Sequence, residues 1–447
     1  MKKVITYGTF DLFHEGHENL LRRAKALGDY LIVGVTTDTF DMLRGKLNTH
    51  DSLMKRIESV WKSGYADEVI LEEYNGQKIS DILRYGVDIF AIGSDWEGKF
   101  DYLENYCKVV YLPRTEGVSS TLIRRERLIR MGIIGTGKMG GRFFNESKTV
   151  QAIRITAAYD KDYNKCLDFC STKQIALAAK DLTELLDNCD AVYVATPHYS
   201  HYEYVKEALL AGKHVMCETP FVLHSNEAEE LLDLAEEKGL VLLIAHKTAY
   251  CPAFEQLMFA VRSGVIGSVV DINASVTTIT DESSSLMDPC EQGGSMNENA
   301  CFPILPIVKI LGTDFLNINF YSKMKKGVDI YTKAIFRYAS ATASFQVGLG
   351  AKTEGSMIIS GTSGYIYVPA PWWKTDYFEF RFEDQNQNKK FFMPFAGDGL
   401  RYEIKEFSIA VLAPKPMNRV TLTREEIIAM AKVQELYLNG VNLFKLI

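Results

Sequence analysis

Buried-strand patterns recur at short intervals through the first third of the chain. Short runs rich in Val, Ile, Tyr and Phe predict five strands, at residues 3–7, 30–35, 68–71, 88–92 and 108–112. Between them the apolar residues take the spacing of amphipathic helices, as in the segment 20–27. Strands that alternate with helices form a small parallel sheet covered on both faces, and ligands bind at the carboxyl ends of its strands.

A second alternating region begins near residue 130. The glycine-rich segment Gly135–Gly140 follows a predicted strand and opens a helix, and the next strand covers Ile153–Tyr159. Further along, residues 269–395 are rich in strand-forming residues, and a helical pattern returns near 423–438. The chain therefore continues as α/β and then becomes β-rich.

Length and composition narrow the possibilities only slightly. The 447 residues suggest two or three domains, and a net charge of −7 does not favour a broad nucleic-acid surface. Eight cysteines stand without zinc-site spacing. No apolar run is long enough for membrane insertion, and the first residues do not resemble a signal peptide, so we expect a cytoplasmic protein.

Two histidines follow the first predicted strand. His14 and His17 stand three residues apart, at the turn and in the first turn of the next helix. This spacing aims both imidazoles at a helix N-terminus, where anions are favoured. Both rings can donate hydrogen bonds to a phosphate whose charge grows during reaction. A lone pair of this kind is more often an ordinary surface pair on a helix start.

A second segment changes that balance. Residues 114–121, RTEGVSST, come after the last of the five strands, and their hydroxyl residues open another helix. Hydroxyl side chains and the N–H groups of a helix start suit the outer phosphates of a nucleotide. Two such helix starts in one small domain favour nucleotide binding.

Residues 1 to about 127 resemble the glycerol-3-phosphate cytidylyltransferase family. The segments that carry the resemblance are 8–17 (GTFDLFHEGH), 20–33, 65–70, 93–100 and 112–121. The resemblance implies an enzyme that transfers CMP from CTP, with Mg²⁺, to a polyol phosphate. It further implies glycerol 3-phosphate as acceptor and CDP-glycerol as product, for a cell-surface polymer such as teichoic acid or capsule.

The resemblance also assigns roles. His14 and His17 would contact the transition-state oxygens, and Lys46 would hold the phosphates as a point charge. The β- and γ-phosphates would be held by Ser119, Ser120 and Thr121. The nucleotide pocket would comprise Gly8, Thr9, Phe10, Asp11, Asp95, Trp96 and Arg114, with Asp11 also helping to place the metal. Alternatively, Lys46 is a solvated loop lysine, Asp95 a turn residue and Trp96 a packing aromatic.

One position departs from the family pattern. Gly64 stands where many relatives carry an arginine, so a basic contact to the acceptor phosphate is missing or is supplied by Lys55 or Arg56. This leaves CTP binding intact but makes the identity of the polyol phosphate less certain.

The second region carries a dinucleotide-binding pattern. The spacing Gly135-x-Gly137-x-x-Gly140 is weak evidence alone, but the next strand ends in Asp160, where a ribose-binding acid belongs. A carboxylate there repels a 2′-phosphate, so NAD is favoured over NADP.

Residues 130–447 resemble the Gfo/Idh/MocA oxidoreductase family. The resemblance rests on 190–198, 212–220, 247–253 and 266–267. It implies a Rossmann domain, then an open and largely antiparallel sheet, with the helix near 423–438 packing back on the first half. The implied cofactor contacts are Gly135, Gly137, Lys138, Met139, Gly140, Asp160, Thr196, Pro197, His201 and Glu218.

The catalytic pattern of that family is eroded here. Thr219 replaces the usual lysine, and aligning the glycine pair 293–294 places Glu298 at the acid and Phe302 at the His or Tyr. Neither Thr219 nor Phe302 exchanges a proton near neutral pH. Four other residues stand nearby in the sequence: His198, His201, His246 and Lys247. One of them replaces the missing proton-exchanging residue, or they are structural or ribose contacts.

The prediction is an α/β chain of three domains. Residues 1–128 form a small Rossmann-like nucleotidyltransferase domain, 129–250 an NAD-binding Rossmann domain and 251–447 an α+β open-sheet domain. The first interpretation is a bifunctional enzyme, whose second half reduces the precursor of the polyol phosphate that the first half activates. The alternatives are a cytidylyltransferase with a degenerate NAD-binding scaffold or regulatory module, a transferase that acts on another polyol phosphate, and an adenylyltransferase of the wider His-x-x-His superfamily. A homodimer or larger homo-oligomer is expected, without nucleic-acid partners.

Overall fold

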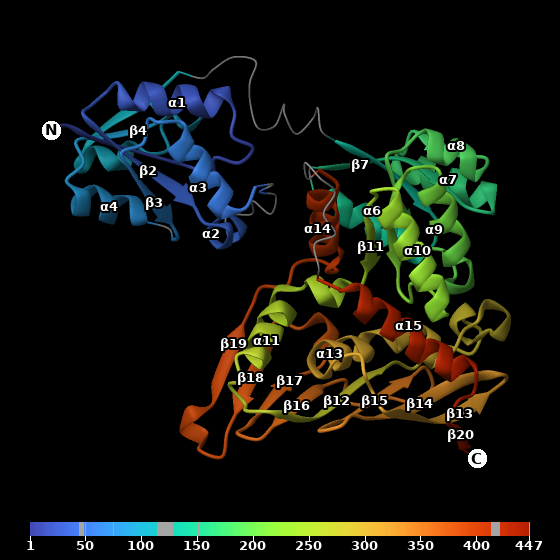
Figure 1. Cartoon of the computed structure of the whole chain (residues 1–447). Helices are drawn as coiled ribbons and strands as arrows, with labels where there is room; N and C mark the ends of the chain where they lie inside the picture. Colours follow the sequence, from blue (N-terminus) through green and yellow to red (C-terminus); the bar gives the residue numbers. More distant parts are fainter. Residues whose placement is uncertain are drawn as a thin grey trace. The chain divides into compact units, whose positions relative to one another are not determined.

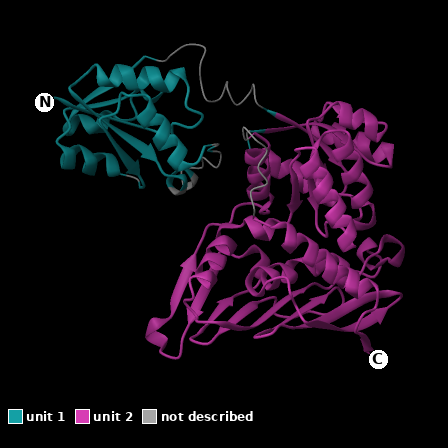
Figure 2. Cartoon of the chain, in the orientation of Figure 1, with its two compact units in different colours: residues 1–128, 149–152 teal, residues 129–148, 153–447 magenta. Residues whose placement is uncertain are grey.

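The computed structural model describes residues 1–43, 49, 51–74, 76–113, 128–150, 152–412 and 421–446 (Figure 1). The chain forms two compact units (Figure 2). Unit 1 is residues 1–128 with 149–152, and unit 2 is 129–148 with 153–447. The boundary predicted at residue 250 lies inside unit 2, between its two sheets, so the three-domain division stays a prediction. Among the described residues, no helix combines the length and apolar character needed to cross a membrane.

Unit 1 is built on a five-stranded parallel sheet in the order β3-β2-β1-β4-β5. The strands are β1 (Lys3–Gly8), β2 (Tyr30–Thr36), β3 (Glu68–Glu72), β4 (Ile89–Gly93) and β5 (Lys108–Leu112). The helices are α1 (Glu15–Lys25), α2 (Asp38–Leu43), α3 (Leu53–Lys62) and α4 (Gln77–Tyr85). Alternate residues of β1 enter separate apolar clusters, Val4 with α1 and α3 and Ile5 with α4. The predicted two-sided sheet is confirmed.

Unit 2 begins with a six-stranded parallel sheet in the order β11-β10-β9-β6-β7-β8. Its strands are β6 (Ile129–Ile134), β7 (Ile153–Tyr159), β8 (Leu177–Ala178), β9 (Ala191–Val194), β10 (His214–Glu218) and β11 (Leu242–Ala245). Its helices are α6 (Lys138–Ser147), α7 (Tyr163–Lys173), α8 (Leu182–Asp187), α9 (His201–Leu210) and α10 (Ser225–Glu237). This is the expected Rossmann arrangement.

The second sheet of unit 2 has nine strands, in the order β19-β18-β17-β16-β12-β15-β14-β13-β20. Its strands are β12 (Val269–Thr277), β13 (Asn317–Lys325), β14 (Val328–Arg337), β15 (Thr342–Gly348), β16 (Met357–Gly361), β17 (Tyr365–Val368), β18 (Tyr377–Arg381), β19 (Lys389–Phe392) and β20 (Leu443–Leu446). The pairs β12–β15 and β13–β20 are parallel and the others antiparallel, so the sheet is mixed.

Three helices lie between the two sheets of unit 2, namely α11 (Pro252–Arg262), α13 (Cys301–Leu311) and α15 (Arg424–Leu438) (Figure 1). Two others are α12 (Ser295–Asn299), which packs against β14, and α14 (Leu400–Leu412), which packs against α6. Helix α15 packs against α10, where the Ser225 hydroxyl donates to the Glu435 carboxylate at 2.6 Å. The closing helix therefore packs back on the first half, as the family resemblance implied.

Candidate functional site

The turn between β1 and α1 holds the predicted nucleotide contacts of unit 1. Gly8 ends the strand, and Thr9, Phe10 and Asp11 follow at the carboxyl edge of the sheet. Phe10 takes a φ of +53° and is 1% exposed, so its ring enters the core while the backbone reverses direction. Burial of this aromatic ring thus anchors the turn that carries the histidines.

The rings of His14 and His17 stack, with centroids 4.0 Å apart and planes at 21°. His14 is the N-cap of α1, and its Nδ1 accepts the N–H of Gly16 at 3.0 Å. In the neutral ring the proton therefore sits on Nε2, which becomes the donor. The His17 ring also meets Phe10 and Phe13 at 5.4 and 5.5 Å. The turn fixes both imidazoles side by side, as the spacing predicted.

Arg56 is not available for the acceptor phosphate. The side chain is fully buried, and its guanidinium donates to the carbonyls of Thr9 at 2.7 Å, Thr36 at 2.8 Å and Asp51 at 3.1 Å. The suggestion that it replaces the arginine missing at residue 64 is therefore wrong, because it ties three segments together. The side chain of Lys55 is 55% exposed, and its Nζ lies 2.6 Å from Oδ1 of Asp51. Lys55 therefore stays the predicted contact to the acceptor phosphate.

Asp11 is also a buried member of this turn. It is 2% exposed, and its Oδ1 accepts the N–H of Asp51 at 2.8 Å. The carboxylate therefore ties the turn to the segment before α3. Its roles in metal placement and nucleotide binding stay predictions.

Asp95 and Trp96 lie on the short helix η1 (Ser94–Trp96), directly after β4. Because β1 and β4 are adjacent parallel strands, η1 and the histidine turn share one edge of the sheet. Trp96 is 39% exposed, with the ammonium of Lys99 5.0 Å from its ring centroid. The exposed indole suits a base-stacking surface, although it also contacts Phe100 at 5.9 Å. Both nucleotide-pocket assignments stay predictions.

Five predicted site residues of unit 1 lie outside the described residues: the phosphate contacts Lys46, Ser119, Ser120 and Thr121, and the nucleotide-pocket residue Arg114.

The glycine turn of unit 2 has the geometry of a dinucleotide site. Gly135 takes a φ of +99°, and a Cβ there would lie 2.6 Å from the carbonyl oxygen of Ala195. A Cβ on Gly140 would lie 2.3 Å from the Gly135 oxygen. Gly137 is the N-cap of α6 with no side-chain cap, and Lys138 and Met139 form the first turn. The helix N-terminus can therefore receive a pyrophosphate.

Asp160 follows β7 and binds the glycine turn. Its Oδ2 accepts the N–H of Thr136 at 2.9 Å and the Thr136 hydroxyl at 2.8 Å. Burial raises the pKa of this carboxyl, but these hydrogen bonds and the charge of Lys165, 3.7 Å away, lower it below its usual value. The ionised carboxylate suits the hydroxyl groups of a ribose. Because the Lys165 ammonium would attract a 2′-phosphate, the preference for NAD over NADP stays a prediction.

The loop after β9 carries Thr196 and Pro197, and it is anchored by His201. That imidazole is 1% exposed, with Nε2 2.8 Å from the carbonyl of Thr196 and Nδ1 2.9 Å from that of Pro220. Burial lowers its pKa to about 4. The ring thus joins the loops after β9 and β10, and its predicted cofactor contact stays a prediction, as do those of Thr196 and Pro197.

Glu218, at the end of β10, belongs to a charged cluster in which Glu218 and Lys247 are half-buried and Glu403 is fully buried. The hydroxyl of Tyr193 donates to its carboxylate, and the Tyr193 ring stacks on Phe143 of α6 at 3.7 Å. Burial raises the pKa of Glu218. Lys247, in the short helix η4 (Lys247–Tyr250), interacts electrostatically with both Glu218 and Glu403 of α14. The cofactor contact assigned to Glu218 stays a prediction.

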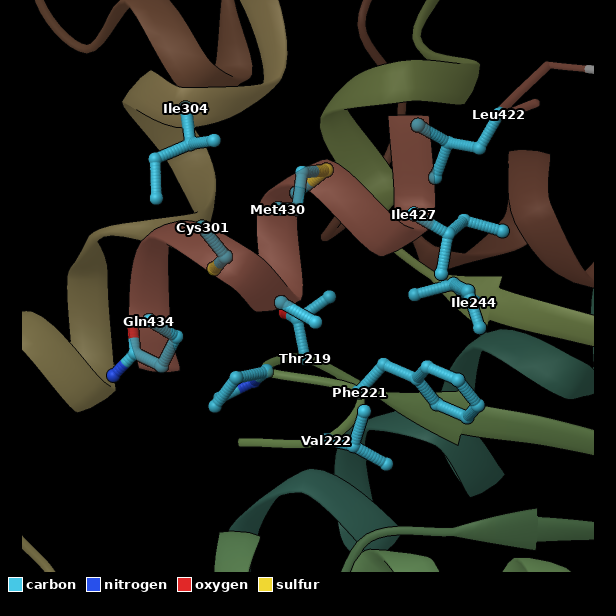
Figure 3. A pocket seen from close by; sticks show the side chains of 12 residues that line it. Thr219, Phe221, Val222, Ile244, Cys301, Ile304, Leu422, Ile427, Met430 and Gln434 are labelled. Carbon is cyan, nitrogen blue, oxygen red and sulfur yellow. The ribbon is translucent and has the colours of Figure 1, made fainter. Parts of the chain in front are cut away.

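Thr219 and Phe302 supply no acid to this site. Thr219 lines an apolar pocket with Cys301, Ile427 and Met430 (Figure 3). Burial raises the pKa of the Cys301 thiol to about 12. Phe302 packs edge-on against His246 at 5.4 Å. These groups shape the site but cannot exchange a proton readily near neutral pH.

His198 makes a direct contact that the motifs did not predict. Its Nε2 lies 2.9 Å from Oε1 of Glu298, which joins the helix η3 (His198–Ser200) to α12. The two side chains are 15% and 19% exposed. The sequence singled out each residue separately, but their 100-residue separation gave no signal that they pair. The pair is a candidate proton-exchanging group at the carboxyl edge of the six-stranded sheet.

Sequence reasoning missed Tyr193, Glu403 and Lys374 entirely. Tyr193 sits inside an apolar strand, and the other two lie far along the chain outside any motif. Packing alone brings Glu403 and Lys374 into electrostatic contact with Lys247. The only sequence signal for any of the three was Glu403, a charged residue in the helical pattern of residues 400–412.

Comparison with known families agrees with the two units. Residues 5–126 match the family described as cytidylyltransferase-like. Residues 129–246 match the Gfo/Idh/MocA oxidoreductase family with its NAD-binding Rossmann fold.

Individual proteins extend the comparison. A glycerol-3-phosphate cytidylyltransferase of Bacillus spizizenii is 55% identical over 126 residues, 28% of this chain and 97% of the relative. A scyllo-inositol 2-dehydrogenase (NADP(+)) of Bacillus subtilis is 26% identical over 319 residues, 69% of this chain and 95% of the relative. A 3-ketoreductase from Actinomadura kijaniata, solved with NADP and TDP-benzene, has a TM-score of 0.64 at 22% identity, covering 72% of this chain and all of that one. This last likeness shows the fold of unit 2.

Proposed function

Because the chain belongs to the glycerol-3-phosphate cytidylyltransferase family through its first domain, fused to a Gfo/Idh/MocA oxidoreductase domain, we propose that unit 1 makes CDP-glycerol. An oxygen of glycerol 3-phosphate attacks the α-phosphorus of CTP, the bond to the β-phosphate oxygen breaks, and pyrophosphate leaves. The stacked pair His14 and His17 carries the proposal, because it presents two ring donors at one helix start.

The protein's part in this transfer is positioning and charge stabilisation. Donors fixed before the reaction stabilise the negative charge that grows on the phosphate oxygens. Mg²⁺ is expected to arrive with the phosphates of CTP, whose oxygens are ligands it prefers. The direct test is pyrophosphate release from CTP with glycerol 3-phosphate. The expected use of the product is the synthesis of a cell-surface polymer.

For unit 2 we propose NAD(P)H-dependent reduction of the keto or aldehyde precursor of the acceptor that unit 1 uses. The glycine turn and Asp160 support cofactor binding, with NAD favoured by the carboxylate at that position. A bound reduced nicotinamide supplies the hydride to the carbonyl carbon. The chain must then give the carbonyl oxygen a proton, and fusion of the two units suits consecutive steps.

His198 is the residue that this proposal assigns as proton donor. His201 and His246 are buried, and burial lowers the pKa of each to about 4. Burial also raises the pKa of Tyr193 well above its usual value. The His198 ring, by contrast, is partly exposed and is oriented by the Glu298 carboxylate. Lys247 is the second candidate for the proton donor, since burial lowers the pKa of its ammonium group from the usual value.

Replacing His198 by glutamine is expected to slow NADH oxidation by about two to four orders of magnitude, the usual contribution of general acid catalysis. Glu298→Gln keeps the shape but removes the orienting charge, so it should also slow turnover. Absorbance at 340 nm with phosphorylated trioses and pentuloses measures the rate, and fluorescence titration should show unchanged NADH affinity.

The matched control for these variants is His224→Gln, a histidine of unit 2 whose side chain makes no capping hydrogen bond. It should behave like the unaltered protein. Full activity of the His198 variant would show that His198 is not the proton donor and would assign that role to Lys247. No turnover by any form, with NADH still bound, would instead support the reading of unit 2 as a degenerate scaffold.

A further inference from the structure

Three cationic side chains of unit 2 come together from three separate elements. Arg142 is on α6, Lys247 is in η4 and Lys374 ends the short helix η7 (Trp372–Lys374). Burial lowers the pKa of Lys247, and the charges of Lys374 and Arg142 lower it further. The carboxylate of Asp398 joins the outer two, 3.7 Å from the Lys374 ammonium and 3.9 Å from the Arg142 guanidinium. The three cations therefore share one small region.

The outer two cations are only loosely engaged. Both distances to Asp398 exceed hydrogen-bond length. Within the part of the chain that the structure describes, neither side chain donates a hydrogen bond to an oxygen, and they are 36% and 31% exposed. Arg401 on the neighbouring α14 differs, since it grips Glu146 with two bonds of 2.9 and 2.7 Å. The donors of Arg142 and Lys374 can therefore turn to a ligand.

The local charge balance favours an anion. Burial raises the pKa of Glu403 well above its usual value, and the charge of Glu218 adds to the rise. The structure records no hydrogen-bond partner among the described residues for either oxygen of the fully buried Glu403. Burial thus disfavours the charged form of Glu403. Among the described residues, Arg142 and Lys374 share the single carboxylate of Asp398, so this pair of cations is only half matched by negative charge.

The three cations lie near the proposed reduction site of unit 2. The hydroxyl of Thr248, beside Lys247, donates to the carbonyl of Trp373 at 2.9 Å. The Trp373 ring lies 6.5 Å from that of Phe302, the residue at the eroded catalytic position. Lys374 is thus tied to η4 and stands next to the aromatic wall of the proposed active site.

We propose that Arg142 and Lys374, with Lys247 behind them, bind the phosphate of a phosphorylated keto or aldehyde substrate. An arginine fork and a lysine point charge together suit a phosphate monoester, which carries −1.5 to −2 charges near pH 7. This assignment rests on the proposed reduction by unit 2. It means that phosphorylation precedes reduction, so the product of unit 2 is already the polyol phosphate that unit 1 consumes. A phosphate of the cofactor has the same chemistry and is the competing occupant.

The test uses the full chain loaded with NADH and the variants Lys374→Gln and Arg142→Gln. Lys390→Gln is the matched control, because its ammonium also lies 3.7 Å from a carboxylate, that of Glu379, elsewhere in unit 2. Calorimetry measures the binding of dihydroxyacetone phosphate and ribulose 5-phosphate, with dihydroxyacetone and ribulose as uncharged counterparts. Each site variant should weaken the phosphorylated probe about tenfold or more, as expected for one lost charged contact. The control should leave its affinity unchanged.

The outcomes separate the possibilities. Weaker binding of the phosphorylated probes with unchanged NADH affinity and unchanged uncharged probes supports the site. Loss of NADH affinity in either site variant would assign the cations to the cofactor and overturn the proposal, as would failure of the unaltered protein to bind either phosphorylated probe at millimolar concentration. If the phosphorylated probes bind as expected but NADH is never oxidised, the phosphate site stands and the proposed reduction fails.

Discussion

Replacing His14 or His17 by alanine is expected to lower kcat for CMP transfer by about a hundredfold or more. This is the usual cost of removing one preorganised donor to a developing charge. The two rings stack at 4.0 Å, and the His17 ring also packs near the rings of Phe10 and Phe13. Because this geometry exists before substrate binds, its loss should fall on kcat more than on KM for CTP. Pyrophosphate release under saturating substrates measures the effect.

The two histidines need different controls. Only His14 accepts the Gly16 N–H as the helix cap, so its alanine variant also loses about 1 kcal/mol of helix capping. His14→Asn retains a capping acceptor and should recover thermal stability but not activity. His224→Ala, in unit 2, should leave transfer unchanged. Activity within twofold of the unaltered protein for either alanine variant would show that the wrong residues were chosen.

Gly135→Asp is expected to abolish NADH binding while leaving CTP chemistry nearly untouched. The substitution places a Cβ 2.6 Å from the Ala195 oxygen at a φ of +99°. It also adds a negative charge where the pyrophosphate would approach. Fluorescence titration with NADH and pyrophosphate release from CTP, measured on the same preparation, give the two readouts.

Gly137→Asp distinguishes lost binding from lost folding. Gly137 has a φ of −76°, and a Cβ there would meet nothing within 4 Å. Aspartate is also a favourable N-cap, so α6 should remain intact. The new carboxylate still stands at the helix start, and NADH binding should fall sharply with no loss of thermal stability. Tight NADH binding by this variant would place the cofactor elsewhere.

Regular elements with strong patterns were predictable. Each of the five predicted strands of unit 1 matches a strand within a residue or two, because continuous apolar runs are typical of strands buried on both faces. The Rossmann turn was predictable for a similar reason, since only glycine avoids the clashes found at residues 135 and 140. The histidine turn combined a strand, a tight turn and a helix start, and its local geometry followed from residue spacing.

Contacts between distant segments were not predictable. His198 meets Glu298 across 100 residues, and Lys374 reaches the vicinity of Lys247 from an element that carries no motif. Arg56 illustrates the converse error, since it was considered as a contact to the acceptor phosphate and instead lies fully buried. Three main-chain carbonyls satisfy its guanidinium, an arrangement that only the packed structure reveals. Local pattern fixes local geometry, whereas tertiary packing decides which polar groups meet.

The central claim is that unit 1 transfers CMP to glycerol 3-phosphate, and one measurement tests it most directly. The purified full chain is incubated with Mg²⁺, glycerol 3-phosphate and either CTP or ATP, and pyrophosphate release is followed over time. Rapid release with CTP, formation of CDP-glycerol and little release with ATP are the expected results. Faster turnover with ATP, or no release from CTP with glycerol 3-phosphate or any other polyol phosphate, would contradict it.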